Sequence, residues 1–228
     1  MKKSPARIVI SIQLLISALI IIMITSCRKA DETREYGWFE FVIPDLDSSA
    51  TVVDMSFLNP EPAGNLGYIA LRDGHFIDGK GNRIRFFGTN LTFGACFPEK
   101  EISTSLSARL RKLGMNVMRL HHMDNQKAPR GIWDSTMKEF DAGQTDRMDW
   151  LIYQLKQHGI YTNINLHVSR NYPGSNYLDI EQFNYGKGID QFYRPYIEMQ
   201  KDYARKLLLH RNPSVSYTHL TLPTKRIV

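Results

Sequence analysis

Outside its two ends, the sequence lacks an excess of charge of either sign. The 228 residues carry a formal net charge of +6. Five of the positive charges lie at the ends, on Lys2, Lys3, Arg7, Lys225 and Arg226, and without them the net charge falls from +6 to +1. A nearly neutral body offers no basic surface for a polyanion. We therefore expect no nucleic-acid partner.

The chain is also poor in cysteine, with only Cys27 and Cys96. Two cysteines cannot provide the several disulfides that stabilise many small secreted domains. Cys96 lies close to Phe93 and Phe97, and a cysteine among aromatic residues is expected to be a small packed side chain and not a nucleophile. The fold must therefore depend on a hydrophobic core, which a composition of 43% hydrophobic residues can supply.

No apolar stretch is long enough for an ordinary membrane-spanning helix. The apolar run at 8–24 is interrupted by Ser11, Gln13 and Ser17, and it is shorter than the roughly 20 residues that a span needs. A basic N-terminus followed by such a run is typical of a secretory signal. We therefore predict a signal peptide at residues 1–26.

The apolar run leads into Ile24-Thr25-Ser26-Cys27, which resembles the lipobox of bacterial lipoproteins. The resemblance implies that Cys27 becomes the lipid-bearing first residue after cleavage, and that residues 27–37 form a short tether. It also implies a membrane-anchored lipoprotein outside the cytoplasm, at the cell surface or in the periplasm. The alternative is an uncleaved membrane anchor, which would leave the domain on the same side of the membrane.

Residues 38–66 are predicted to form an N-terminal β segment. Its short apolar runs, at Trp38–Ile43 and Thr51–Val53, are separated by residues that favour turns. Both runs are therefore expected to be strands.

A small β-hairpin is expected next, from residue 67 onward. Asp-Gly steps occur at Asp73-Gly74 and Asp78-Gly79, and this dipeptide favours tight turns because glycine accepts a positive φ. The hairpin should lead directly into a buried strand at Arg85–Asn90, which stops near Leu91.

The middle of the chain contains one unit twice: an amphipathic helix, a glycine, and a short strand that ends in histidine. A shift of 45 positions places Gly114 on Gly159 and His122 on His167. The repeat predicts two successive βα units of an α/β barrel with parallel strands. The expected boundaries are helices capped at Ser103 or Thr104 and at Thr145, and strands at 117–122 and 161–168.

Polar and apolar residues alternate in the second of these strands. Asn163, Asn165 and His167 fall on one side, as expected of a barrel strand whose inward side lines a site. A solvated edge strand would show the same alternation. The repeated helix–glycine–strand unit favours the barrel.

Residues 171–196 are predicted to form a long irregular loop, and loops of this length tend to be functional. Aromatic faces stack on the C–H faces of sugar rings, so an aromatic loop at the mouth of a barrel suits a carbohydrate cleft. The alternative is a lid that packs on its own small core. A third helix is expected at Pro195–Arg211. The aromatic residues of the loop are Tyr172, Tyr177, Phe183, Tyr185, Phe192, Tyr193 and Tyr196.

Three short motifs follow one another at the spacing of βα units: Phe86–Asn90, Leu113–Leu120 and His158–His167. With them the chain resembles the first third of a clan A glycoside hydrolase, closest to the cellulase-like family 5 group. The resemblance implies a TIM (β/α)₈ barrel, of which residues 67–213 would hold the first three βα units. It implies no cofactor, and it implies polysaccharide or oligosaccharide substrates with β-linkages, such as glucans and mannans.

The resemblance also implies roles for four residues. The arginine that matches Arg119 supports the nucleophile carboxylate in the family, and the histidine that matches His167 lines the sugar site nearest the cleaved bond. Asn90 matches an asparagine near the floor of the cleft. His122 is expected at the rim of the barrel, beside the substrate.

None of the glutamates fits the catalytic positions that the family requires. Hydrolysis with retention needs two carboxylic acids about 5–5.5 Å apart, and in the family one follows an asparagine at the end of strand four and the other ends strand seven. We therefore expect an N-terminal fragment with no catalytic residue of its own and both glutamates beyond Pro213. Residues 214–228 fit no barrel element and resemble a translated sequencing adaptor, so a non-native tail is expected there.

Two other interpretations stay open. His121, His122 and Asp124 could join His167 in a metal site of a barrel hydrolase or sugar isomerase. Adjacent histidines of a strand point to opposite faces, so ordinary hydrogen-bonded cleft histidines, with no metal, are preferred. A non-catalytic surface glycan-binding lipoprotein would also explain a chain that lacks both glutamates.

Overall fold

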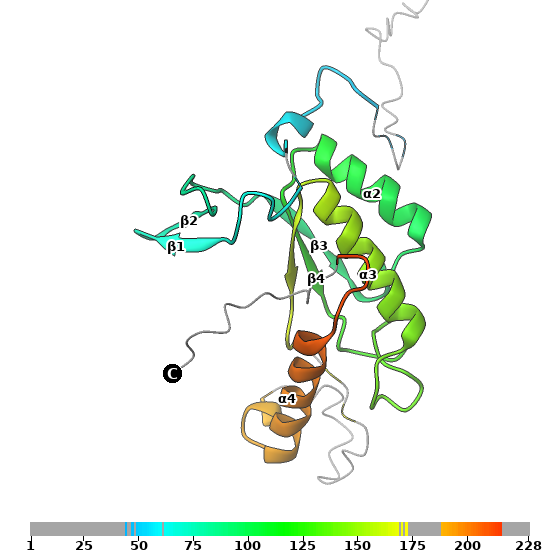
Figure 1. Cartoon of the computed structure of the whole chain (residues 1–228). Coiled ribbons are helices and arrows are strands. Elements are labelled where there is room, and N and C mark those ends of the chain that lie inside the picture. Colours follow the sequence, from blue (N-terminus) through cyan, green and yellow to red (C-terminus); the bar gives the residue numbers. More distant parts are fainter. Residues whose placement is uncertain are drawn as a thin grey trace, which may run out of the picture. The chain divides into compact units, whose positions relative to one another are not determined.

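The computed structural model describes residues 44, 47, 49–60, 62–168, 170, 172 and 188–215. The chain divides into two compact units, 1–44 and 45–228, and every helix and strand below belongs to the second (Figure 1). The predicted signal peptide, Cys27, the tether, the strand at Trp38–Ile43 and the tail from residue 216 lie outside the described residues. Within the described part, no helix is both long and apolar enough to cross a membrane.

A parallel three-stranded sheet forms the centre of the second unit. Strands β3 (Gly88–Thr92), β4 (Val117–His121) and β5 (Tyr161–Ile164) are hydrogen-bonded in the order β3-β4-β5. Helix α2 (Lys100–Lys112) connects β3 to β4, and helix α3 (Ala142–Gln157) connects β4 to β5. Both helices cover the same face of the sheet (Figure 1). The two predicted successive βα units are confirmed.

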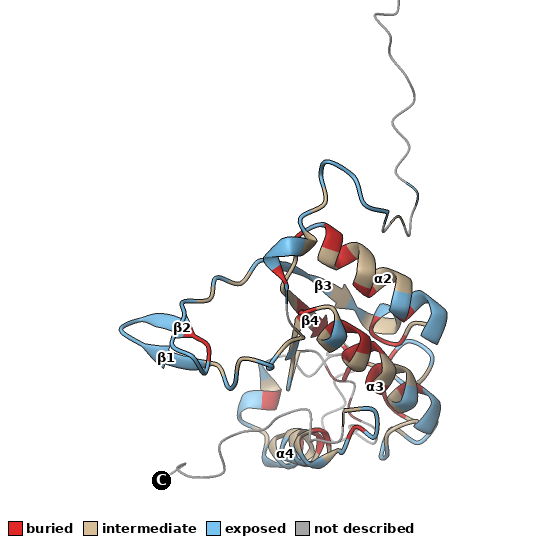
Figure 2. Cartoon of the chain, turned by 45° about the horizontal axis from the view of Figure 1, so that its top comes forward, coloured by how far each residue is buried: buried red, intermediate tan, exposed pale blue. Residues whose placement is uncertain are grey.

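Burial along β4 follows the alternation of a strand. Met118 and Leu120 are fully buried in the core cluster beneath the helices, whereas Arg119 and His121 are only partly buried. Successive side chains of a strand point to opposite faces. The even-numbered side chains of β4 therefore pack against the helices, and the odd-numbered side chains lie on the other face of the sheet. Figure 2 shows this buried layer running through β4 and α3.

The apolar residues of α3 lie on one buried face of the helix, as their spacing predicts. Met148, Leu151, Ile152 and Leu155, spaced as one helical face, are all buried in the core. In α2 the predicted face is only partly used, because Leu110 is buried but Leu113 is 48% exposed.

The two glycines of the repeat end their helices as predicted. Gly114 has φ 73° and Gly159 has φ 75°, the left-handed conformation that ends many helices. The next amide in each case reaches back to the last turn: Met115 N donates to Leu110 O at 3.1 Å, and Ile160 N donates to Leu155 O at 2.9 Å. Each glycine thereby turns the chain from a helix into the following strand.

The predicted N-terminus of α2 is wrong. The helix begins at Lys100, one turn earlier than expected, with Glu99 in the capping position. Ser103 and Thr104 lie inside the helix, and their hydroxyls donate to the carbonyls of Glu99 and Lys100. Hydroxyl side chains make such bonds four residues back within a helix, so the same residue types fit a cap and a first turn.

Helix α3 repeats this error. It begins at Ala142, and Asp141 is the cap, since its carboxylate accepts from Gln144 N at 2.9 Å. Thr145, the predicted cap, lies in the first turn and donates to Asp141 O at 2.7 Å. An aspartate preceding the helix provides the stronger capping acceptor.

The strand predictions before the sheet are partly confirmed. Strands β1 (Ala70–Arg72) and β2 (His75–Ile77) pair as the expected antiparallel hairpin. Thr51–Val53 is a turn and not a strand, and it precedes a short 3-10 helix, η1 (Ser56–Leu58). The described residues before β1 therefore contain no strand.

Two strands of the sheet are shorter than predicted. β3 begins at Gly88 instead of Arg85, and it is largely exposed instead of buried, because it lies at one edge of the described sheet. β5 ends at Ile164. His167 therefore lies beyond the end of its strand and is not bound to the strand's alternation.

A third helix, α4 (Arg194–Leu209), follows the short 3-10 helix η4 (Ile189–Gln191), close to the predicted span. Tyr203 and Leu207 bury one side of α4 in the core. Its C-terminal end is tied to α3: His210 Nε2 lies 2.9 Å from both carboxylate oxygens of Asp149, and Asn212 Nδ2 donates to Asp149 O at 2.9 Å.

Replacing Gly114 by alanine should destabilise the chain more than the same change at Gly74. Both glycines have φ +73°, so each alanine would cost about 1–2 kcal/mol for a left-handed backbone. A Cβ at Gly114 would also lie 3.1 Å from Met55 Cβ, whereas nothing lies within 4 Å of one at Gly74. Urea unfolding followed by circular dichroism measures both losses. Equal losses would contradict a packing role for Gly114.

Candidate functional site

Polar side chains gather on the sheet face opposite the helices. Asn90, Arg119 and Asn163 occupy the same register row across β3, β4 and β5. Parallel strands in register present such a row on one face, which is how the two motif residues Asn90 and Arg119 come to be neighbours. Asn90 is exposed and Arg119 is partly buried.

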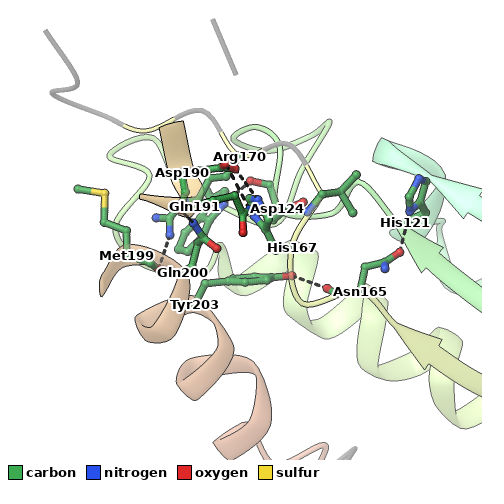
Figure 3. A network of polar contacts seen from close by, with 12 residues as sticks. His121, Asp124, Asn165, His167, Arg170, Asp190, Gln191, Met199, Gln200 and Tyr203 are labelled. Atoms are coloured by element: carbon green, nitrogen blue, oxygen red, sulfur yellow. Dashed lines mark hydrogen bonds and ion pairs between the residues drawn. The ribbon is translucent and has the colours of Figure 1, made fainter. Parts of the chain in front are cut away.

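Asn165, just after β5, joins this row to the residues beyond it. Arg119 Nε donates to Asn165 Oδ1 at 2.8 Å, and His121 Nδ1 lies 2.6 Å from the same oxygen. Tyr203 of α4 donates its hydroxyl to Asn165 O at 3.4 Å. Figure 3 shows Asn165 between His121 on one side and the residues around His167 on the other.

His167 lies between two buried carboxylates. Its Nε2 is 2.7 Å from Asp190 Oδ2 and its Nδ1 is 3.6 Å from Asp124 Oδ2. The side chains of Asp124 and Asp190 are 2% and 3% exposed. The Asp124 carboxylate is the main cause that raises the pKa of His167, burial opposes it, and Asp190 adds to the rise. The imidazolium form of His167 is therefore favoured here.

Arg170, which follows β5, packs against the core. Its guanidinium lies 3.8 Å from the Trp133 ring centroid, and its terminal nitrogens donate to the carbonyls of Met199 and Met137 at 2.9 and 3.1 Å. Trp133 in turn donates Nε1 to Asp124 O at 2.9 Å. Burial lowers the pKa of Arg170, and a cation stacked on indole is a favourable way to bury that charge.

The predicted site residues fall into three places. Asn90 and Arg119 share the polar row, His167 belongs to the carboxylate cluster, and His122 lies beside Phe93, with ring centroids 4.6 Å apart. The ring centroids of His121 and His122 are only 4.1 Å apart. The two side chains therefore do not point to opposite faces of the sheet, and that prediction is wrong. The reason is that His122 leaves the strand with φ 60°.

Asp190 and Arg170 were missed by the sequence reasoning. Asp190 precedes α4 in a segment without periodicity, and its contact with His167 across 23 positions is what brings it into the site. Asn165 was found as part of an alternating pattern, but the pattern could not show that its oxygen serves two residues of β4.

Cys96 is a packed side chain, as predicted. It is fully buried, and its Sγ lies 3.3 Å from Leu91 O and 3.5 Å from His121 O. Burial raises the pKa of the thiol to about 12. A thiol that stays protonated at neutral pH is a poor nucleophile.

Four of the seven loop aromatics can be placed, and Tyr177, Phe183 and Tyr185 lie outside the described residues. Tyr172 and Tyr196 are buried and stack with ring centroids 3.9 Å apart. Tyr196 belongs to α4, so this stack packs Tyr172 against the helix. Phe192, in contrast, is 87% exposed and lines a shallow hollow with Tyr193.

Across the described ranges, no three histidine, cysteine, aspartate or glutamate side chains are grouped as metal ligands would be. His121 and His167, which the metal interpretation would bring together, have different partners. His121 bonds to Asn165 and His167 bonds to Asp190.

No family model matches the chain, and no curated protein does. Among solved structures, the chain is similar to an endo-1,4-beta-mannanase from Rhizomucor miehei, with a TM-score of 0.51 and 19% sequence identity. The match covers 67% of this chain and 44% of the mannanase. The likeness is one of fold. The chain is a mixed α/β structure with a parallel sheet, and it spans less than half the length of the mannanase.

The free energy of unfolding should fall as the pH rises through the raised pKa of His167. A group with a raised pKa in the folded state holds its proton more tightly there. The contribution of His167 to the free energy of unfolding is therefore complete below its ordinary pKa of 6.5. It is lost as the pH rises above the raised pKa of the folded state. Urea unfolding from about pH 5.5 to about pH 9 measures the loss.

Two variants separate His167 from other titrating groups in this measurement. Asp190→Asn removes one of the carboxylates that raise the pKa, so it should flatten the pH dependence. His75→Gln changes an exposed histidine of β2 and should leave the dependence as it is. If Asp190→Asn leaves the pH dependence of the free energy of unfolding unchanged, the carboxylates around His167 do not control that dependence.

Proposed function

We propose that the chain is part of a glycoside hydrolase that acts on β-linked glycans through two glutamates. The support comes from the fold likeness to a mannanase and from the polar face of the sheet. The observation that carries the proposal is the position of Arg119 on that face, fixed by Asn165 and facing away from the helices. Cellulase-like and mannanase-like substrates both fit this proposal.

Arg119 is prepared to bind a carboxylate. Its Nε is used by Asn165, and its terminal nitrogens have no acceptor among the described residues. A guanidinium whose orientation is already fixed loses little freedom when it forms two parallel hydrogen bonds to a carboxylate. This geometry agrees with the role that the family resemblance implies, which is support of the nucleophile.

Asp124 and Asp190 are unsuited to be the catalytic pair. Both carboxylates are buried and both face His167, so neither is placed to reach a glycosidic oxygen. A retaining hydrolase needs one free nucleophile and one proton donor at a short separation. We propose that these two acids are glutamates beyond Pro213 in the complete protein, and that Asn90, Arg119, His122 and His167 support and bind the substrate around them.

Replacing Arg119 by alanine should lower the kcat/KM of the complete gene product by about 100-fold, the loss usual for one preorganised donor of an active site. A reducing-sugar assay on β-1,4-mannan and β-1,4-glucan measures it. Arg72→Ala, which changes an exposed arginine of β1, is the matched control. If the wild type binds these glycans and releases no reducing ends, the protein is a glycan-binding lipoprotein instead of an enzyme.

We further propose that the protein is anchored outside the cytoplasm through a lipid on Cys27. In a bacterial host, Cys27→Ser should abolish incorporation of labelled palmitate and move the protein from the membrane fraction to the soluble one. Cys96→Ala changes a buried thiol and should leave labelling intact. Labelling that survives Cys27→Ser would rule out the lipid anchor.

A further inference from the structure

The hydrogen bonds around Asn165 determine which ring nitrogen of neutral His121 carries the proton. Arg119 Nε can only donate, and it lies 2.8 Å from Asn165 Oδ1, so this atom must be the amide oxygen and not the nitrogen. His121 Nδ1 lies 2.6 Å from the same oxygen. Two atoms that both approach one acceptor must both donate. Neutral His121 is therefore the Nδ1–H tautomer.

The second ring nitrogen of His121 is then an acceptor. In a neutral imidazole, one nitrogen donates and the other accepts. His121 Nε2 therefore carries a lone pair, and it has no donor among the described residues. The side chain is only partly buried, on the polar face of β4 beside Arg119.

We propose that His121 is a glycan-binding residue whose Nε2 accepts a hydrogen bond from a sugar hydroxyl, with Asn165 as the positioning residue that holds this tautomer. The inference rests on the function proposed above and deepens it. The hydroxyl that donates to Nε2 keeps its oxygen free to accept. Arg119 lies two residues away on the same face of β4 and bonds to the same oxygen of Asn165. Its terminal nitrogens carry four N–H donors, so two remain after a carboxylate has taken two. Donor and acceptor side by side match the vicinal hydroxyls of a sugar ring.

His121 is better placed for this contact than His167. Both nitrogens of His167 face carboxylates, so a hydroxyl would have to displace Asp190 to reach Nε2. His158 is occupied in another way, since its Nδ1 lies 2.8 Å from Gln154 O. That carbonyl can only accept, which fixes His158 as Nδ1–H as well and makes it an internal standard for the tautomer.

The experiment is long-range ¹H–¹⁵N NMR of the histidine rings in the full chain, before and after addition of β-1,4-linked mannotetraose and cellotetraose. We expect Nδ1 to carry the proton in His121, as in His158. Addition of the bound glycan should shift His121 Nε2 and leave His158 unchanged. The tautomer is read without any glycan, so it is tested separately from the proposed function.

Two variants at position 165 test the positioning role. Asn165→Asp keeps an oxygen between Arg119 and His121 and should keep the Nδ1–H tautomer. Asn165→Leu removes the acceptor, so His121 should no longer favour Nδ1–H and glycan affinity should fall about tenfold, the effect of one lost hydrogen bond. If Asn165→Leu does not fold, the wild-type tautomer and Asn165→Asp still decide the question.

The possible failures are distinguishable. A wild-type His121 that is protonated at Nε2 overturns the inference, whatever the chain binds. A glycan that shifts Arg119 but not His121 overturns the inference and leaves the proposed function intact. A chain with the predicted tautomer that no β-glycan perturbs anywhere on the polar face overturns both.

Discussion

Burial of Met118 and Leu120 beneath two helices is the constraint on which the rest of the structure depends. These side chains fill the centre of the core on the helix side of β4. A strand that gives one set of residues to a core must give the other set to the opposite face. Arg119 and His121 lie on the polar face for this reason. The candidate site is thus a consequence of core packing, and no element specific to the site places its first residues.

Much of this layout could be predicted because its causes are local. The glycine, apolar spacing and strand of each βα unit lie within one short segment, and the second copy at Gly159 supports the first at Gly114. The polar alternation at Asn163 and Asn165 was equally local. The helix starts were misplaced because the signal is ambiguous: serine and threonine suit a cap and a first turn alike, as Ser103 and Thr145 show.

The chemistry of the site was less predictable, because it depends on contacts between distant segments. His167 receives Asp190 from 23 positions away and Asn165 reaches Arg119 across 46. No spacing rule anticipates either contact. A family motif could mark His167 and Arg119 as important, but it could not show that His167 has both nitrogens occupied. Arg119 and His121 can share the oxygen of Asn165 only after β4 and β5 have paired.

The hydrogen bonds between α3 and the end of α4 close a long loop of the chain, and this closure has an entropic cost. The bond from Asn212 to Asp149 closes a loop of 63 residues, which contains β5, the aromatic segment and α4. The entropy lost on closing a loop grows only with the logarithm of its length. The entropic cost of this closure therefore changes little when residues are inserted between β5 and α4, whereas the contacts made at the end of β5 and by α4, such as those of Asn165 and Tyr203, must be kept. The length of the connection between β5 and α4 is therefore freer to change in evolution than the elements at its two ends.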